Sequence, residues 1–356
     1  MNQDYINKLE QSIQNIKDKQ SRIYLFVQDT KGHAKASVAY IYRMGLTLLE
    51  NGYNPVILHE SSDYEGVAEW LGAEYMEKLP HQSVENENLA ISPEDFIVLP
   101  ELYGYIMEQI TKLPCGKIVL SQAFDHVFET LNPGQVWQQF GFYKCITTSE
   151  TQKELLSGIF RTASYDIIEP YISNEFKPSE TPVYPYVAVH AREQRDSVNL
   201  IKQFYIKYPQ YRWVTFRDMR GLSETEFAEA IRECCIAIWI DETSSYGTYP
   251  LECMKSNVPV LGLVPNIVPK WMNEKNGFWV NNKLDLVDFA ADYIQNWLED
   301  SINDEVYDEM KKTVSELPTE DDFKTNVINL FDEYLSKRLE SFEEQSNKLQ
   351  TIEQGE

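Results

Sequence analysis

The sequence predicts an α/β protein with two doubly wound, Rossmann-like domains that face a cleft, followed by C-terminal helices. Short apolar, β-branched segments alternate with amphipathic helical patterns along most of the chain, which is typical of parallel sheets covered by helices. A chain of 356 residues is also long for a single hydrophobic core. The non-periodic segment 173–185 carries three prolines after Lys177, as a linker between two domains would.

The chain begins with an amphipathic helix, because Ile6, Leu9, Ile13 and Ile16 recur at helical spacing within residues 1–20. This helix packs on the body of the protein or on another subunit. A strand, a glycine-containing loop, a helix over 36–51 and a second strand then form a βαβ unit. In all, the first half is expected to hold about five strands, as a doubly wound domain does. They are expected at 22–29, 55–59, 96–99, 117–120 and 144–148.

A second α/β pattern follows the linker. Its strands are expected at 186–190 and 212–216, with helices over 197–208 and 224–233. The last long segment, from 321 to about 349, has the apolar spacing of a helix that crosses back to brace the first domain, with a frayed polar end from Glu343. We therefore place the first domain at 1–176, the second at 177–320 and the terminal helix at 321–356.

The segment from Cys235 to Val264 carries the strongest functional signal. It predicts a buried strand, a polar loop, a short helix and a second buried strand. The loop opens directly into the helix, so its backbone N–H groups and the helix dipole favour a phosphate. Glu252, expected in the first helical turn, can accept hydrogen bonds from ribose hydroxyls. The loop and helix-start residues expected at this phosphate and ribose site are Ser244, Ser245, Tyr246, Gly247, Thr248 and Tyr249. Tyr246 and Tyr249 either stack on a nucleotide base or only cap the helix.

Polar residues in the first half fall where expected strands end, which is the ligand side of a doubly wound sheet. Gly32 and His33 follow the first strand, and Gln122, Asp125 and His126 follow the KIVLSQ strand. We expect them on the first domain's side of the cleft, with His126 as a candidate base. The alternative is that each histidine is a solvated loop residue. Glu101 and Tyr103 also follow a strand and face the cleft by the same rule.

The charge balance argues against nucleic acid and anionic membranes as partners. The chain has 32 Lys and Arg against 56 Asp and Glu, a net charge of −24, whereas affinity for either partner comes largely from basic residues. No apolar run approaches the roughly 20 residues that span a bilayer. The N-terminal residues resemble no secretory signal, which predicts a cytoplasmic protein.

The five cysteines are odd in number and show neither C-x-x-C nor a zinc-like cluster with histidine. Neither a disulfide framework nor a metal site is therefore expected. Cys234 and Cys235 are interpreted as buried core residues. The sequence also contains no Asp-x-Asp, G-x-G-x-x-G or Walker loop, which disfavours metal-dependent sugar transfer, dehydrogenase and P-loop interpretations.

The second half resembles the retaining glycosyltransferases of the GT-B fold, in particular the family 4 group. The segment 244–252 is similar to the family's Glu-x7-Glu loop and helix, 257–262 to its next strand, and 276–280 to its Asn-Gly segment. Upstream, 168–172 looks like the family's entry to the interdomain linker. Arg192 stands where the family's phosphate-binding basic residues follow a strand. The resemblance covers about 167–280 and is only architectural before that.

Two positions depart from the family pattern. Ser244 replaces the first glutamate, which by the resemblance would contact the donor sugar, whereas Glu252 keeps the second, which would contact the ribose. Glu242 could substitute for the lost carboxylate if the loop register shifts. Arg195 stands near the place of the family's lysine, and a guanidinium can also clamp a diphosphate. Both arginines could instead pair with Glu193 and Asp196.

The resemblance implies a hexosyltransferase that moves a sugar from a nucleoside diphosphate-sugar donor to a glycan or lipid-linked acceptor in polysaccharide biosynthesis. Retention of configuration, no metal and no further cofactor are implied with it. Glu252, Arg192, Arg195 and His126 are the expected catalytic residues. The loss of one signature glutamate leaves a non-catalytic GT-B partner subunit or scaffold as the alternative. A sugar-nucleotide epimerase on the same plan is a third hypothesis.

Overall fold

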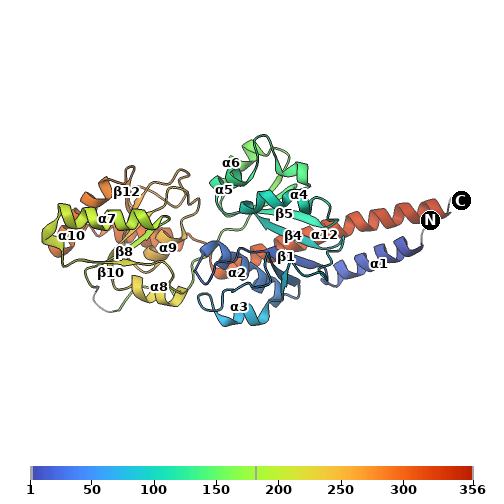
Figure 1. Ribbon diagram of the computed structural model, residues 1–356, viewed down its shortest axis with the longest axis horizontal. Coiled ribbons are helices and arrows are strands. Elements are labelled where there is room, and N and C mark those ends of the chain that lie inside the picture. The colour runs from blue at the N-terminus through green and yellow to red at the C-terminus, as the bar shows by residue number, and fades with distance from the viewer. Residues whose placement is uncertain (1–2, 181–182, 355–356) are drawn as a thin grey trace. The chain divides into compact units, whose positions relative to one another are not determined.

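The computed structural model describes residues 3–180 and 183–354, and the chain divides into two compact units. Unit 1 comprises Met1–Glu169 together with Asp321–Glu356, and unit 2 comprises Pro170–Glu320. Figure 1 shows both units as sheets covered by helices. The units meet in sequence at Glu169 and Pro170, whereas the sequence analysis placed that boundary at residue 176.

Unit 1 contains a seven-stranded sheet in the order β3-β2-β1-β4-β5-β6-β7, and all of its pairs are parallel. Strand β1 pairs with β2 on one side and β4 on the other, so the strand order reverses direction at β1. The carboxyl ends of β1 and β4 therefore form the crevice at which doubly wound sheets bind ligands. The strands are β1 (Arg22–Phe26), β2 (Asn54–His59), β3 (His81–Ser83), β4 (Phe96–Pro100), β5 (Gly116–Ser121), β6 (Lys144–Thr147) and β7 (Ser164–Ile167).

Helices cover both faces of this sheet. Alternate residues of neighbouring strands, such as Tyr24, Val56 and Ile97, share one face and pack in one core cluster. The helical elements of unit 1 are α1 (Gln3–Lys17), α2 (Ala36–Glu50), α3 (Ala73–Lys78), η1 (Glu101–Ile106), α4 (Met107–Ile110), α5 (Phe124–Thr130), η2 (Trp137–Phe140), α6 (Glu150–Ile159) and α12 (Glu320–Gln354).

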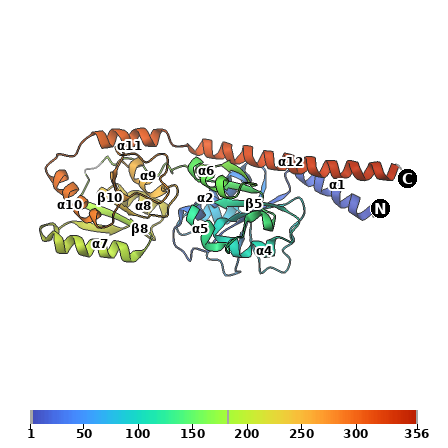
Figure 2. The same cartoon turned by 90° about the horizontal axis from the view of Figure 1, so that it is seen from above.

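The long helix α12 contacts unit 1 at several points. The hydroxyl of Tyr334 donates to Oδ2 of Asp166 in β7 at 2.6 Å, and Tyr53 donates to Asp332 at 2.6 Å. Near its C-terminal part, α12 lies beside α1 in both views (Figures 1 and 2), where Lys17 and Glu343 form an ion pair at 2.8 Å. The helix continues to Gln354, so the expected fraying from Glu343 is wrong.

Unit 2 contains a five-stranded parallel sheet in the order β12-β11-β10-β8-β9. Its central strand is completely buried, as its run of apolar residues predicts. The strands are β8 (Tyr186–Ala191), β9 (Thr215–Asp218), β10 (Cys234–Ile240), β11 (Val260–Leu263) and β12 (Phe278–Val280). The helical elements are α7 (Gln194–Lys207), η3 (Pro209–Tyr211), α8 (Glu224–Ile231), α9 (Thr248–Lys255), α10 (Asp285–Leu298) and α11 (Glu305–Ser315).

The predicted fold class is confirmed, since both units are parallel α/β sheets covered by helices. The expectation of about five strands in the first half was too low, because β3 and β7 are short and polar. The strand expected at 212–216 begins only at Thr215, because η3 and a turn occupy the residues before it. All five cysteines are free and buried. Among the helices that the structure describes, none is long and apolar enough to cross a bilayer.

Candidate functional site

The segment singled out in the sequence forms the expected strand, loop, helix and strand. Strand β10 ends at Ile240, a loop spans 241–247, and α9 begins at Thr248. Strand β11 then pairs in parallel with β10. The loop therefore leaves the sheet at its carboxyl end, which is the ligand side of this architecture.

Gly247 makes the turn from this loop into α9. Its φ of 77° is left-handed, and a Cβ atom there would lie 2.9 Å from Cζ2 of Trp271. The indole Nε1 of Trp271 donates to the carbonyl of Tyr246 at 2.6 Å. Trp271 thus holds the loop in place and leaves no room for a side chain at position 247.

The start of α9 carries no side-chain cap and no acidic residue in its first turn. The backbone N–H groups of Thr248 and Tyr249 lie at this end, whereas Pro250 has none. A helix start of this kind keeps its positive partial charge and can bind a phosphate group.

Three N–H groups of the preceding loop are already used within it. Oδ1 of Asp241 accepts hydrogen bonds from the N–H groups of Thr243 at 3.0 Å and Ser244 at 3.2 Å. The hydroxyl of Ser244 in turn accepts the N–H of Gly247 at 3.1 Å. The expectation that the N–H groups of the whole 244–248 loop serve a phosphate is therefore corrected, because those of Ser244 and Gly247 hold the loop itself.

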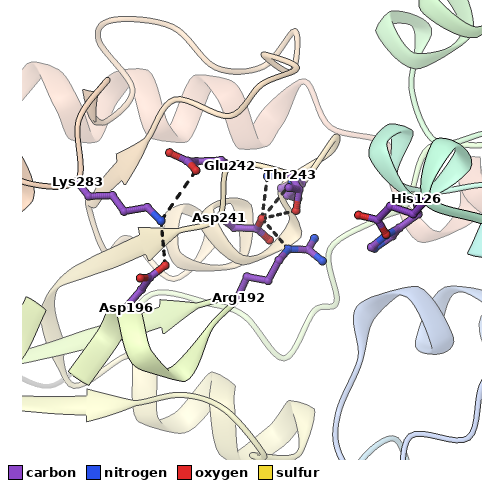
Figure 3. A network of polar contacts seen from close by, with 10 residues as sticks. His126, Arg192, Asp196, Asp241, Glu242, Thr243 and Lys283 are labelled. Carbon is purple, nitrogen blue, oxygen red and sulfur yellow. Dashed lines mark hydrogen bonds and ion pairs between the residues drawn. The ribbon is translucent and has the colours of Figure 1, made fainter. Parts of the chain in front are cut away.

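Arg192 lies beside this loop because of the register of the sheet. Ala191 of β8 is opposite Ile240 of β10, so the residue after each strand end lies next to the other. Nε of Arg192 donates to Oδ1 of Asp241 at 3.0 Å, as Figure 3 shows. The side chain of Asp241 is only 11% exposed and that of Arg192 is 38% exposed. Arg192 therefore pairs with a carboxylate, as one alternative held, and the partner that the structure shows is Asp241.

A second ion-pair group lies at the same end of the sheet. Nζ of Lys283 is 2.9 Å from Oδ2 of Asp196 and 3.9 Å from Oε2 of Glu242 (Figure 3). Arg195 is exposed, at the start of α7. Sequence reasoning missed Lys283, because the strand before it, β12, was not recognised and the strand-end rule could not be applied. Glu242 is 48% exposed and directed to this lysine.

Glu252 and the two tyrosines differ from expectation in their positions. Glu252 is the fifth residue of α9 and half-buried, so it lies beyond the first helical turn. Tyr246 and Tyr249 are 8% and 6% exposed and belong to the core of unit 2. Their rings pack inside the protein, which leaves their backbones, rather than their rings, for contact with a ligand. Ser245 is also buried, at 2% exposure.

His190 is a further residue that sequence reasoning missed. It is the penultimate residue of β8, and its ring stacks on Tyr249 at 4.7 Å. Burial lowers the pKa of His190, against the opposing effect of the carboxylates of Asp241 and Asp218. A neutral imidazole therefore lies beneath the start of α9. His190 was missed because it lies between the buried residues Val189 and Ala191, in a strand whose other residues are mostly apolar.

In unit 1, the candidate residues follow three adjacent strands, β1, β4 and β5. Gly32 and His33 lie in the loop after β1, where His33 is exposed. Gln122 follows β5 directly, and Asp125 and His126 lie in the first turn of α5. Nδ1 of His126 is 2.7 Å from Oε2 of Glu129.

Glu101 connects these strand ends. It follows β4, is only 2% exposed, and its Oε1 accepts the N–H groups of Gln122 at 3.1 Å and Ala123 at 2.6 Å. The side-chain amide of Gln122 donates to the carbonyl of Ser37, in the first turn of α2, at 3.1 Å. Burial raises the pKa of Glu101 to about 7, although these N–H groups and nearby His126 favour its ionised form.

Within the described residues, no group of three or more His, Cys, Asp or Glu side chains is arranged to hold a metal ion. No protein-family model matches the sequence. The chain is 28% identical over 229 residues to an alpha-1,6-glucosyltransferase of Actinobacillus pleuropneumoniae serotype 7. That match covers 61% of this chain and 65% of the relative, so the chain spans less than two thirds of the relative's length.

Several solved structures share the architecture of both units. Sucrose-phosphate synthase from Thermosynechococcus elongatus is 13% identical, with a TM-score of 0.63 over 89% of this chain and 100% of its own. S. aureus TarM, solved with UDP, is 8% identical, with a TM-score of 0.61 over 87% and 99%. Anabaena HepE, solved with UDP and glucose, is 10% identical, with a TM-score of 0.54 over 88% and 99%. At these identities the similarity shows the fold.

Proposed function

The chain has the GT-B fold and is similar to family 4-like glycosyltransferases, and from that premise we propose that it is a hexosyltransferase. It transfers a hexose from a nucleoside diphosphate-sugar to a glycan or lipid-linked acceptor, without a metal and with retention of configuration. Unit 2 binds the donor, and unit 1 receives the acceptor. The 28% identity to an alpha-1,6-glucosyltransferase and the sugar-handling neighbours support this proposal.

One observation supports it most directly: the uncapped start of α9 lies at the same sheet end as Arg192, which is held by Asp241. In sugar transfer, negative charge grows on the departing diphosphate while the sugar becomes oxocarbenium-like. A helix N-terminus and a guanidinium stabilise that charge without a proton transfer. Arg192 and the N–H groups of Thr248 and Tyr249 therefore bind the diphosphate.

The other residues are assigned by their positions around this anion site. Glu252 accepts the ribose hydroxyls, and Arg195 adds positive charge at the same sheet end. Ser244 has a short hydroxyl where the resemblance expects a carboxylate, and that hydroxyl accepts the N–H of Gly247. The sugar therefore takes its main contacts elsewhere, with Glu242 as the candidate carboxylate that the sequence offers. Unit 1 contributes Gln122, Asp125, His126, Gly32 and His33 to the acceptor.

Isothermal titration with UDP, GDP and ADP tests the donor site. We expect one nucleotide to bind the wild-type chain, and Arg192→Ala and Glu252→Ala each to weaken it by roughly tenfold, about 1.4 kcal/mol. The controls are Arg212→Ala and Glu229→Ala, two exposed residues away from the carboxyl ends of the strands. Absence of binding by all three nucleotides, or unchanged affinity in both site variants, would refute the assignment.

A non-catalytic partner subunit is the second candidate, and Ser244 is the observation that favours it. The wild-type protein and Ser244→Glu are compared for release of hexose from the donor that binds. Hydrolysis or transfer by the wild-type chain supports the enzyme. Turnover that occurs only in the Ser244→Glu variant supports the partner subunit. The free, unbridged cysteines suit a cytoplasmic setting for either function.

A further inference from the structure

The carboxyl group of Glu101 is buried at the point in unit 1 where the strand order reverses. Glu101 follows β4 and is 2% exposed. One oxygen, Oε1, accepts two backbone N–H groups, those of Gln122 and Ala123. The other, Oε2, is buried and has no hydrogen-bond partner among the described residues. A buried carboxyl group with one unpartnered oxygen is costly, so a specific role for it is worth seeking.

Both ends of α5 are attached to this one residue. The carboxyl group holds the turn at Ala123, which is the N-cap of α5. The backbone carbonyl of Glu101 accepts the hydroxyl of Thr130, the last residue of the helix, at 2.9 Å. Since α5 has only seven residues, its own hydrogen bonds stabilise it weakly. The orientation of α5, and with it that of Asp125 and His126, therefore depends on Glu101.

The turn also connects to the neighbouring strand end. The backbone N–H of Gln122 donates to the carboxyl group of Glu101. The side-chain amide of Gln122 donates to the carbonyl of Ser37, at the start of α2. Glu101 after β4, the turn after β5 and the first turn of α2 are thus joined by consecutive hydrogen bonds. The turn after β5 carries Gln122, and the loop before α2 carries Gly32 and His33, which are proposed acceptor residues.

The ionised form of Glu101 holds the turn more strongly than the neutral form, because charge-assisted hydrogen bonds are about twice as strong as neutral ones. Burial raises the pKa of Glu101 to about 7. The titratable groups that face it are His126 on α5, which is paired with Glu129, and the buried thiol of Cys145 on β6. On its own element, Tyr103 is the buried titratable residue, at 2% exposure. The strength of the attachment therefore changes within the neutral pH range.

We propose that Glu101 is the positioning residue of the acceptor side: its carboxylate fixes the Gln122–Ala123 turn and thereby sets how Gln122 and His126 are presented to an acceptor hydroxyl. This inference rests on the proposed function, because that function identifies the ligand as an acceptor. The hydrogen bonds from Gln122 and Ala123 to Glu101 do not depend on it. It goes beyond the donor chemistry, because Glu101 acts through the Gln122–Ala123 turn and not by contact with the substrate.

The attachment is tested without any substrate. In the full-length ¹⁵N-labelled protein, we expect the amide signal of Ala123 to titrate with a midpoint near pH 7, following Glu101. The Glu101→Gln variant should lose this titration. Glu94→Gln is the matched control, because Glu94 is also buried, precedes the same strand and binds Ser12 and Asn15 instead. An Ala123 amide in the wild-type protein that does not titrate between pH 5 and 9 would overturn the proposal, even if Glu101→Gln failed to fold.

The positioning role is tested by transfer with UDP-glucose as donor and methyl α-D-glucoside as the acceptor probe. We expect Glu101→Gln to raise the acceptor KM roughly tenfold at pH 8, with the donor KM within about twofold of wild type. At pH 6 the two proteins should converge. Equal changes in both KM values, or a difference independent of pH, would refute positioning. If no transfer occurs with any protein while the Ala123 titration is present, the proposed function fails and the attachment stands.

Discussion

Nε of Arg192 lies 3.0 Å from Oδ1 of Asp241, and the same oxygen accepts the N–H groups of Thr243 and Ser244. A single carboxylate oxygen thus fixes both the guanidinium and the loop that leads into α9. The cause is the register of two parallel strands, since Ala191 and Ile240 are paired at their carboxyl ends. Asp241 is therefore expected to organise the proposed diphosphate site without contacting the diphosphate.

Asp241→Ala should weaken both the loop and the site. Removal of the carboxylate leaves two loop N–H groups without their acceptor and releases Arg192, so we expect a loss of about 1–3 kcal/mol in stability. Nucleotide affinity, measured by titration calorimetry, should fall roughly tenfold. The control is Asp308→Ala, whose carboxylate is 81% exposed and lies 4.0 Å from Nζ of Lys311 on the surface of unit 2; this change should cost less than about 1 kcal/mol. Equal melting temperatures for both variants would contradict this account.

Gly247→Ala should destabilise unit 2 more than the same change at Gly221. Both residues have a φ of +77°, but a Cβ at Gly221 meets nothing within 4 Å, whereas at Gly247 it would lie 2.9 Å from Trp271. The left-handed conformation alone costs an alanine about 1 kcal/mol. The clash adds on the order of 1–3 kcal/mol at position 247 only. Thermal unfolding of the two variants measures this difference, and similar melting temperatures would show that Trp271 can move aside.

Tyr334→Phe should loosen the terminal helix from unit 1. The hydroxyl of Tyr334 donates to Asp166 at 2.6 Å and so connects α12 to the edge strand β7. Burial raises the pKa of Tyr334 well above its ordinary value, so the hydroxyl stays protonated and donates at all physiological pH values. Its loss should cost about 1–3 kcal/mol. Limited proteolysis should cut α12 faster in this variant, but not in Tyr143→Phe, where the ring is 56% exposed.

The sequence alone predicted the strands and helices correctly where the apolar runs were long. The seven buried residues of β10 and the polar loop after it predicted a strand, loop and helix with boundaries that the structure reproduces closely. It was insufficient for β3 and β7, since three or four residues of mixed polarity show no periodicity. Strand β12 was missed because its three residues, although all apolar, are too few to show a pattern, and Lys283 was missed with it.

The sequence predicted where the site residues lie along the fold, but not which residues they contact. Arg192 was recognised as following a strand, yet its pairing with Asp241 depends on strand register, which the sequence does not encode locally. Tyr246 and Tyr249 could be placed beside the helix start, but their burial follows from packing against Phe227, His190 and Trp271. Glu101 was predicted to face the ligand side, and only the structure shows that its carboxyl group is enclosed under the turn at Gln122.

Glu101 should also make the stability of the protein depend on pH. Its pKa is about 7 in the folded chain against an ordinary value of 4.5, so between these values the unfolded chain loses a proton that the folded chain keeps. The free energy of unfolding should therefore fall as pH rises from about 4.5 to 7 and level off above that, by on the order of 3 kcal/mol in total. Urea unfolding of the wild type and Glu101→Gln at pH 5 and pH 8 isolates this contribution, because glutamine cannot ionise. We expect the stability of the wild type relative to Glu101→Gln to be lower at pH 8 than at pH 5, and a difference that is the same at both pH values would show that Glu101 does not titrate in this range.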